Sequence, residues 1–156
     1  MHILMCNDDG ILADGLRHLA SYLSQYYRIT VVAPANEQSA KSHALTTEVP
    51  LKLDACNGED ENPRLYALTG TPSDCMKFGL SYLLTDDMPD LVISGINHGF
   101  NLGSDVLYSG TVSAAMESGF YGIPGLALSV ERYSVERGDE MHPFIHELIK
   151  KIYVAG

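Results

Sequence analysis

Short apolar runs and longer amphipathic stretches alternate along most of the chain. One apolar run follows His2, another covers residues 29–33, and two more begin at Leu91 and Gly125. Runs of this length that are bounded by polar or turn-forming residues are typical of buried strands. Apolar side chains also recur at helical spacing, which predicts helices over residues 15–26, 72–84, 112–118 and 142–153.

Three connecting stretches complete the pattern. Residues 35–43 are polar and predict a loop, and residues 57–63 predict a surface turn. Polar and apolar side chains alternate over residues 45–53, which predicts a strand with one face in water. Thr71 followed by Pro72 is a typical helix start, because threonine caps free N–H groups and proline fits the first turn.

The order of these segments predicts the fold class. Strands that alternate with helices form a mostly parallel sheet with helices on both faces, so we expect an α/β, three-layer architecture. The 156 residues suit one domain, residues 1–156, with a substantial core.

Composition and charge limit the classes of binding partner. The net charge of −10 argues against a nucleic-acid polymer or an anionic membrane as partner, although a small phosphate ester remains compatible if a metal neutralises the site. The three cysteines have no metal-type or redox spacing, and we expect Cys6 and Cys75 to be buried packing residues. With neither a signal peptide nor a long apolar stretch in the sequence, the expected location is the cytoplasm.

Two adjacent acids follow the first apolar run. Asp8 and Asp9 can serve one site only if the chain leaves the strand there, and Gly10 allows that turn. Adjacent carboxylates repel each other unless a proton or a cation lies between them, and a hard divalent cation is the simplest solution. The alternative is a solvated turn without function.

The segment from Asp90 to Glu117 is the most informative part of the chain. An apolar run leads into a polar, glycine-rich loop and then into Gly110-Thr111 at the start of a predicted helix. Open α/β sheets bind ligands at such strand ends, and a helix N-terminus suits a phosphate. The candidate residues of the loop are Asn97, Asn101, Asp105 and Ser109.

Four segments together resemble the survival-protein-E (SurE) family of metal-dependent acid phosphatases and nucleotidases. They are residues 7–11 (Asn-Asp-Asp-Gly-Ile), 32–39, 70–75 and 94–111, in the order and spacing of the family across nearly the whole chain. The resemblance implies a Rossmann-like fold, one divalent metal cation, with Mg²⁺ or Mn²⁺ expected, and a homo-oligomer. It implies hydrolysis of nucleoside 5′-monophosphates, with 3′-monophosphates and short polyphosphates as further possible substrates.

The same resemblance implies roles for individual residues. Asp8, Asp9, Ser39 and Asn97 match the metal-ligand positions of the family, and Asp8, Asp9 and Asn97 are the catalytic candidates. The positions that match phosphate contacts are Asn101, Ser109, Gly110 and Thr111. Oxygen donors of these types suit Mg²⁺, Mn²⁺ or Ca²⁺.

Alternative roles remain open for several of these residues. Ser39 could cap a turn, and Asn97 and Asn101 could be ordinary loop residues. No side chain is an obvious proton donor for the leaving oxygen, although His98 lies in the right loop, and no aromatic cage for a base is identifiable. His142 and His146 are expected to be surface side chains.

Members of the family are usually much longer than this chain. The additional part would cover apolar surface near the end of this sequence, and we therefore expect some side chains of that surface to be left exposed. The surface includes Leu126, Leu128, Ile145, Leu148, Ile149 and Ile152. Exposed apolar surface favours association and lowers stability. The alternative function is a catalytically impaired module that binds a nucleotide or a partner.

Overall fold

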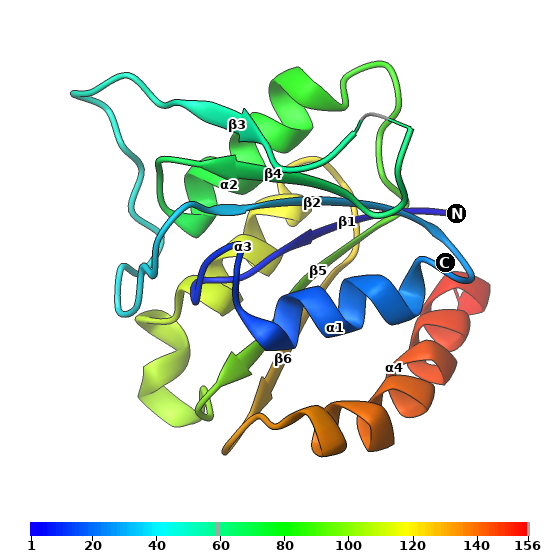
Figure 1. Ribbon diagram of the computed structural model, residues 1–156. Helices are drawn as coiled ribbons and strands as arrows, with labels where there is room; N and C mark the ends of the chain where they lie inside the picture. The colour runs from blue at the N-terminus through cyan, green and yellow to red at the C-terminus, as the bar shows by residue number, and fades with distance from the viewer. Residues whose placement is uncertain (59, 156) are drawn as a thin grey trace.

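The computed structural model describes residues 1–58 and 60–155, which form a six-stranded sheet in the order β3-β4-β2-β1-β5-β6 (Figure 1). β3 runs antiparallel to β4, and all other neighbouring strands are parallel. The predicted mostly parallel sheet is therefore confirmed. The strands are β1 (His2–Cys6), β2 (Arg28–Pro34), β3 (Leu53–Ala55), β4 (Arg64–Leu68), β5 (Leu91–His98) and β6 (Gly125–Val130).

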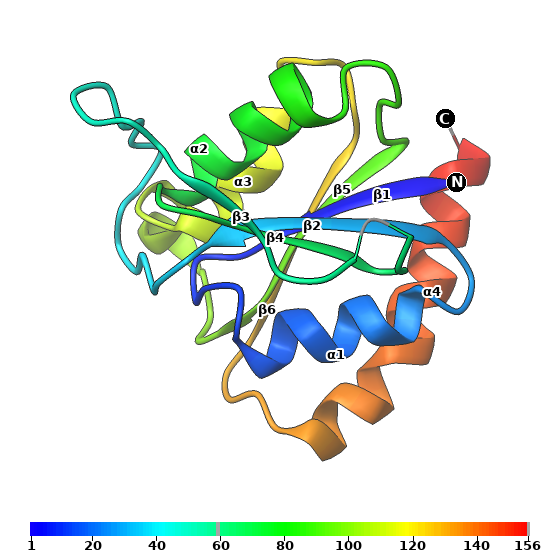
Figure 2. The same ribbon diagram turned by 45° about the horizontal axis from the view of Figure 1, so that its top comes forward.

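Helices cover both faces of the sheet, with α1 and α4 on one face and α2 and α3 on the other (Figures 1 and 2). None of the helices in the described residues is long and apolar enough to cross a membrane. The result is the predicted Rossmann-like, three-layer sandwich. Its helices are α1 (Asp14–Leu23), α2 (Pro72–Phe78), the π-helical turn η1 (Gly79–Leu83), the 3₁₀ helix η2 (Gly103–Leu107), α3 (Gly110–Gly119) and α4 (Val135–Ala155).

Two helices begin with caps that the sequence encodes. The Thr71 hydroxyl accepts a hydrogen bond from the Asp74 N–H, and the Asp74 carboxylate accepts one from the Thr71 N–H, at 3.1 and 2.9 Å. This reciprocal pair is a capping box, which confirms the predicted start of α2. At the start of α3 the Ser109 hydroxyl accepts from the Val112 N–H at 3.1 Å.

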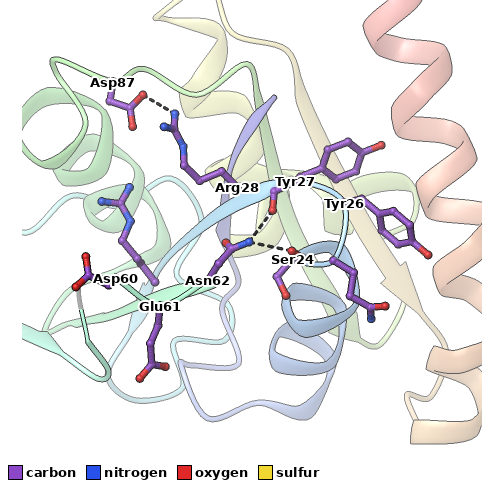
Figure 3. Close-up of a pocket in the computed structure, with 10 residues that line it drawn as sticks. Ser24, Tyr26, Tyr27, Arg28, Asp60, Glu61, Asn62 and Asp87 are labelled. Carbon is purple, nitrogen blue, oxygen red and sulfur yellow. Dashed lines mark hydrogen bonds and ion pairs between the residues drawn. The ribbon is translucent and has the colours of Figure 1, made fainter.

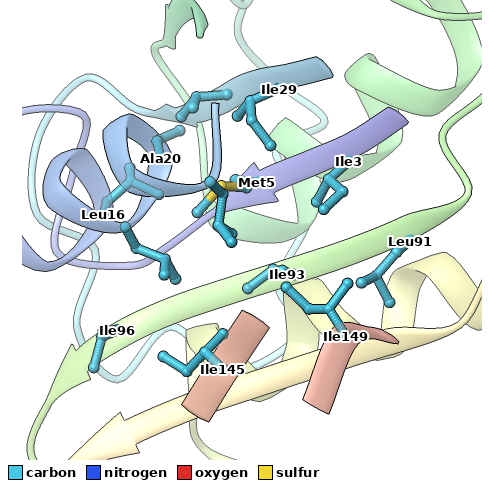
Figure 4. Packing of buried hydrophobic residues seen from close by; sticks show 14 of the residues in the cluster. Ile3, Met5, Leu16, Ala20, Ile29, Leu91, Ile93, Ile96, Ile145 and Ile149 are labelled. Carbon is cyan, nitrogen blue, oxygen red and sulfur yellow. The ribbon is translucent and has the colours of Figure 1, made fainter. Parts of the chain in front are cut away.

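The sheet separates two apolar clusters: the first lies under α1 and α4 and is shown in Figure 4, and the second lies under α2 and α3. β1 is buried along its whole length, and its successive side chains point to opposite faces. Ile3 and Met5 therefore pack under α1 and α4, whereas Leu4 and Cys6 pack under α2 and α3. A central strand that contributes to both clusters fixes the position of the residues that follow it.

Two of the apolar side chains on the surface that was expected to lose cover are in fact fully covered. Ile145 and Ile149 are 2% and 0% exposed, because α4 packs against α1 over the first cluster. Leu126, Leu128 and Ile152 are partly buried against the same cluster.

The prediction of a strand over residues 45–53 is wrong for most of its length. Near its start the N–H of Thr46 donates to Asp74 of α2 at 3.0 Å, and near its end Lys52 exchanges hydrogen bonds with Thr69, the residue after β4, at 2.8 and 3.0 Å. Only Leu53–Ala55 pairs, with β4 (Arg64–Leu68), a strand that the sequence pattern did not predict.

His142 and His146 are buried, which corrects the expectation of surface side chains. α4 begins earlier than predicted, at Val135, and turns both histidines toward α1. The ring centroid of His142 lies 5.0 Å from that of Tyr22, and that of His146 lies 4.2 Å from that of Tyr26. Burial lowers the pKa of both histidines.

We expect stability to fall as the pH drops from 7.5 to 5.5. A histidine whose pKa is lowered by folding binds protons more readily in the unfolded chain, so protonation below about pH 6.5 favours unfolding. Urea midpoints across this range measure the effect. In the His142→Phe variant, which keeps a ring against Tyr22, the loss between the two pH values should shrink. An unchanged pH dependence would contradict a contribution from His142.

Candidate active site

The fold brings the predicted residues to one edge of the sheet. β1 lies between β2 and β5, and the chain proceeds from β1 to β2 on one side and reaches β5 only later on the other. The carboxyl ends of β1 and β5 therefore flank a switch point of the sheet, where open α/β sheets bind ligands.

The turn after β1 is held by its own side chain. The Asn7 amide donates to the carbonyl of Gly10 at 3.0 Å and accepts from the Gly10 N–H at 3.1 Å. Gly10 has a φ of +100°, which glycine adopts without strain. The chain thus leaves the strand at the acid pair, and both Asp8 and Asp9 line the same cavity.

Asp8 is held by the start of α3. The Thr111 hydroxyl donates to the Asp8 carboxylate at 2.6 Å, and both side chains are buried. Gly110 makes this approach possible, because a β-carbon at that position would lie 2.9 Å from the β-carbon of Asp8 and 3.0 Å from Pro72. Neither Thr111 nor Gly110 lines the cavity, so Thr111 orients the Asp8 carboxylate from outside it.

Asn97 and His98 come from the end of β5. The register between β5 and β6 shifts between Ser94 and Asn97, and such irregularities re-aim side chains at strand ends. The Asn97 amide nitrogen donates to the carbonyl of Gly99 at 2.8 Å, so its oxygen is available to a ligand. The His98 N–H donates weakly to Asp9, at 3.4 Å.

Ser39 lies in the loop after β2. The N–H of Gln38 donates to the carbonyl of Asp8 at 2.7 Å, which ties this loop to the acid pair. The exposed Ser39 hydroxyl donates to Glu37 at 2.7 Å and lines the same cavity.

The loop is anchored further along by residues that the sequence did not single out. The His43 ring is hydrogen-bonded to Glu117 at 2.6 Å, and the Glu117 side chain is buried in α3. Thr46 contacts Asp74 through its N–H and its hydroxyl, at 3.0 and 2.6 Å. The segment that contains Ser39 is thus fastened to both α2 and α3.

The cavity has a volume of about 580 Å³ and gathers most of the predicted site. Asn101 also reaches it, with its amide donating to the Ser129 hydroxyl at 2.7 Å. Two aromatic residues that were not predicted, Phe100 and Tyr108, lie on the lining as well. The complete lining is Asp8, Asp9, Glu37, Ser39, Ala40, Asn97, His98, Gly99, Phe100, Asn101, Asp105, Tyr108 and Ser109.

The cavity is acidic. Partial burial, followed by the neighbouring Asp8 carboxylate, raises the pKa of Asp9 above its ordinary value of 3.8. Glu37 and Asp105 add further negative charge, and no lysine or arginine is found among the described lining residues. A bound cation would relieve the repulsion between the carboxylates.

The two cysteines behave as expected for packing residues. Cys6 and Cys75 are both fully buried in the second cluster. Burial, aided by a hydrogen bond with Cys6, raises the pKa of the Cys75 thiol well above its ordinary value. A buried thiol of this kind is a poor nucleophile.

A second cavity, of about 540 Å³, has none of the predicted site residues in its lining (Figure 3). The Asn62 amide donates to the carbonyls of Ser24 and Tyr27, both at 2.9 Å, and the Arg28 side chain pairs with Asp87. These polar groups thus have partners within the protein, which favours a structural role.

Comparison with known proteins gives a consistent result. The sequence profile of the family described as Survival protein SurE matches residues 3–155. Proteins named 5'-nucleotidase SurE are 48% identical over 156 residues in Thermoanaerobacter sp. (strain X514) and 52% identical over 159 residues in Thermosipho africanus. This chain is matched over 100% of its length and spans 61% and 60% of those two relatives.

A solved structure has the same fold. The crystal structure of the SurE protein from Aquifex aeolicus matches with a TM-score of 0.86 and 38% sequence identity, over 100% of this chain and 61% of that one. The profile match, the relatives and the shared fold agree over nearly all of residues 1–156, and the chain therefore belongs to the SurE family.

Proposed function

We propose that this site hydrolyses nucleoside 5′-monophosphates to nucleoside and phosphate. The observation that carries the proposal is the contact between Asp8, at the end of β1, and Thr111, in the first turn of α3, beside Asp9 and Asn97. A carboxylate pair at a switch point and next to a helix start suits phosphate chemistry. The names of the relatives, 5'-nucleotidase SurE, support the same activity.

A divalent cation fits the residues at the site. Within the described residues, no three His, Cys, Asp or Glu side chains form a metal-binding group, so a metal would need amide or hydroxyl oxygens as well. Asp8, Asp9, Asn97 and Ser39 supply such an oxygen set on one cavity, of the kind preferred by Mg²⁺ and Mn²⁺. When bound, the metal would supply a water of lowered pKa and would polarise a phosphoryl oxygen.

The residues of the chain have separate tasks in this proposal. Thr111 holds the Asp8 carboxylate in one orientation through its hydroxyl. Ser109 and Asn101, which line the cavity, contact the phosphate, with the N–H groups of Gly110 and Thr111 adding the positive end of α3. His98 lines the cavity and is the candidate for giving a proton to the leaving oxygen.

The finer features of the activity belong to the same proposal. An open, acidic cavity does not distinguish the 5′ from the 3′ position, so 3′-monophosphates and short polyphosphates are included as substrates. Assembly into a homo-oligomer, which the family resemblance implies, is part of the proposal, and so is the cytoplasmic location expected from the sequence. The alternative remains a module that binds nucleotides without hydrolysing them.

We expect the purified chain to release phosphate from AMP when Mn²⁺ or Mg²⁺ is added, and to lose that activity in EDTA. The metal is needed because the cavity has carboxylates but no described lysine or arginine to neutralise a phosphate. Colorimetric phosphate release measures the effect, and re-addition of metal after EDTA is the control. Binding of AMP without hydrolysis at any metal concentration would instead support the non-catalytic alternative.

A further inference from the structure

Two kinds of side chain line the candidate active site. Asp8, Asp9 and Asn97 offer oxygen atoms, as described above, whereas Phe100 and Tyr108 offer aromatic rings. The two aromatic side chains are 55% and 63% exposed. A cavity that combines polar anchors with apolar surface is typical of small-molecule sites.

Neither ring has a packing role in the described part of the chain. Phe100 and Tyr108 belong to neither apolar cluster, and neither forms an aromatic pair there. Burial in the core therefore does not explain why aromatic residues occupy these positions.

The backbone beneath each ring is nevertheless fixed. The N–H of Gly99 donates to the carbonyl of Val130 at 2.7 Å, and the Asn101 amide donates to Ser129, so β6 holds the residues on both sides of Phe100. The Tyr108 N–H donates to the carbonyl of Asp105 at 3.0 Å, and its own carbonyl accepts from the N–H of Ser42 at 3.1 Å. The structure thus presents two exposed rings on an ordered frame.

The lining and size of the cavity indicate what the rings would contact. An uncharged planar group can stack on a ring without an ionic partner, so contact with the rings needs no basic side chain, and none is found among the described lining residues. The volume of about 580 Å³ exceeds what a phosphate alone would occupy.

We propose that Phe100 and Tyr108 bind the base of the nucleoside monophosphate by stacking. They would thus determine specificity for phosphate esters whose leaving group carries a base. This inference rests on the proposed function. Stacking uses the face that all bases share, so both purine and pyrimidine nucleotides are accepted, with purines preferred for their larger face.

The test compares two substrates that differ only in the base. AMP and ribose 5-phosphate have the same sugar and the same phosphate position, so the ratio of their kcat/KM values isolates the contribution of the base. Phe100→Leu and Tyr108→Leu should each lower kcat/KM for AMP about tenfold and leave the value for ribose 5-phosphate within about twofold. Phe144→Leu and Tyr153→Leu, at exposed positions of α4 that do not line the cavity, are the matched controls.

The possible failures are distinguishable. Equal losses of kcat/KM on both substrates, or no loss on either, would overturn the role of the rings. The proposed phosphatase function would still stand, because phosphate is released. A change in sedimentation with equal losses would instead place the rings in a contact between subunits, which also overturns the inference. If the chain hydrolyses neither substrate, the proposed function fails, and saturation-transfer NMR with adenosine decides on the rings: signal that the two variants lose supports stacking, and signal that they keep refutes it.

Discussion

Replacing Asp8 by Asn is expected to lower phosphate release from AMP by about 10²-fold or more while the fold stays intact. The Asp8 carboxylate is buried, faces the Thr111 hydroxyl at 2.6 Å and lies beside Asp9, so it is the best-positioned ligand for a cation. The amide of the variant keeps an oxygen that accepts from Thr111. It also removes one of two repelling charges, so the loss of activity should not come from unfolding.

Steady-state phosphate release over a metal titration, beside a thermal melt, measures this effect. Asp86→Asn is the matched control, because Asp86 is exposed and lies outside the cavity. Unchanged activity of Asp8→Asn in the presence of EDTA would remove both the metal and this aspartate from the mechanism.

Gly110→Ala is expected to reduce both activity and stability. The added β-carbon would lie 2.9 Å from the β-carbon of Asp8 and 3.0 Å from Pro72, closer than such contacts normally are. The start of α3, the acid or α2 has to move, which overpacks a buried contact at a cost of about 1–3 kcal/mol. Because Asp8 is one of the groups displaced, we expect activity to fall at least about tenfold even where the variant is fully folded.

The same helix contains the control. Gly119, in the last turn of α3, has no atom within 4 Å of an added β-carbon, so Gly119→Ala should be neutral or stabilise by up to about 1 kcal/mol. Urea unfolding and kcat/KM for AMP are measured for both variants. Equal behaviour of the two alanine variants would mean that the close approach at Gly110 is unimportant. Gly110→Val should be more severe than Gly110→Ala, because it adds two further methyl groups.

The main elements of the fold could be predicted because local pattern determines them. Buried parallel strands produce short apolar runs, and the Thr71-Pro72 pair predicts the start of α2. β4 (Arg-Leu-Tyr-Ala-Leu) also contains a short apolar run, residues 65–68, and the prediction missed it. Residues 45–53 have a strand-like alternation, but a strand also needs a neighbour, and of this stretch only Leu53 pairs with β4 in the sheet.

The same limit applies to the site. The convergence of Asp8, Asp9 and Asn97 on one cavity could be predicted, because the two acids follow β1, Asn97 lies near the end of β5, and both strands end at the same edge of the sheet. The contact between His43 and Glu117 joins residues far apart in the sequence, so no local signal indicates it. The spacing of His142 and His146 did not predict their burial. Residues four apart share a helix face, but only tertiary packing decides whether that face contacts solvent or, as here, Tyr22 and Tyr26.

The central position of β1 has a consequence for the order in which the protein folds. β1 is made before the other strands of the sheet, yet one of its two neighbours, β5 (Leu91–His98), is made only after β2, β3 and β4. Pairing across such a sequence distance is slow, because a long loop must close before the contact is gained. Until then the apolar side chains of β1 lack half of their cover. The nascent chain therefore has its greatest need of chaperone protection between the synthesis of β2 and that of β5.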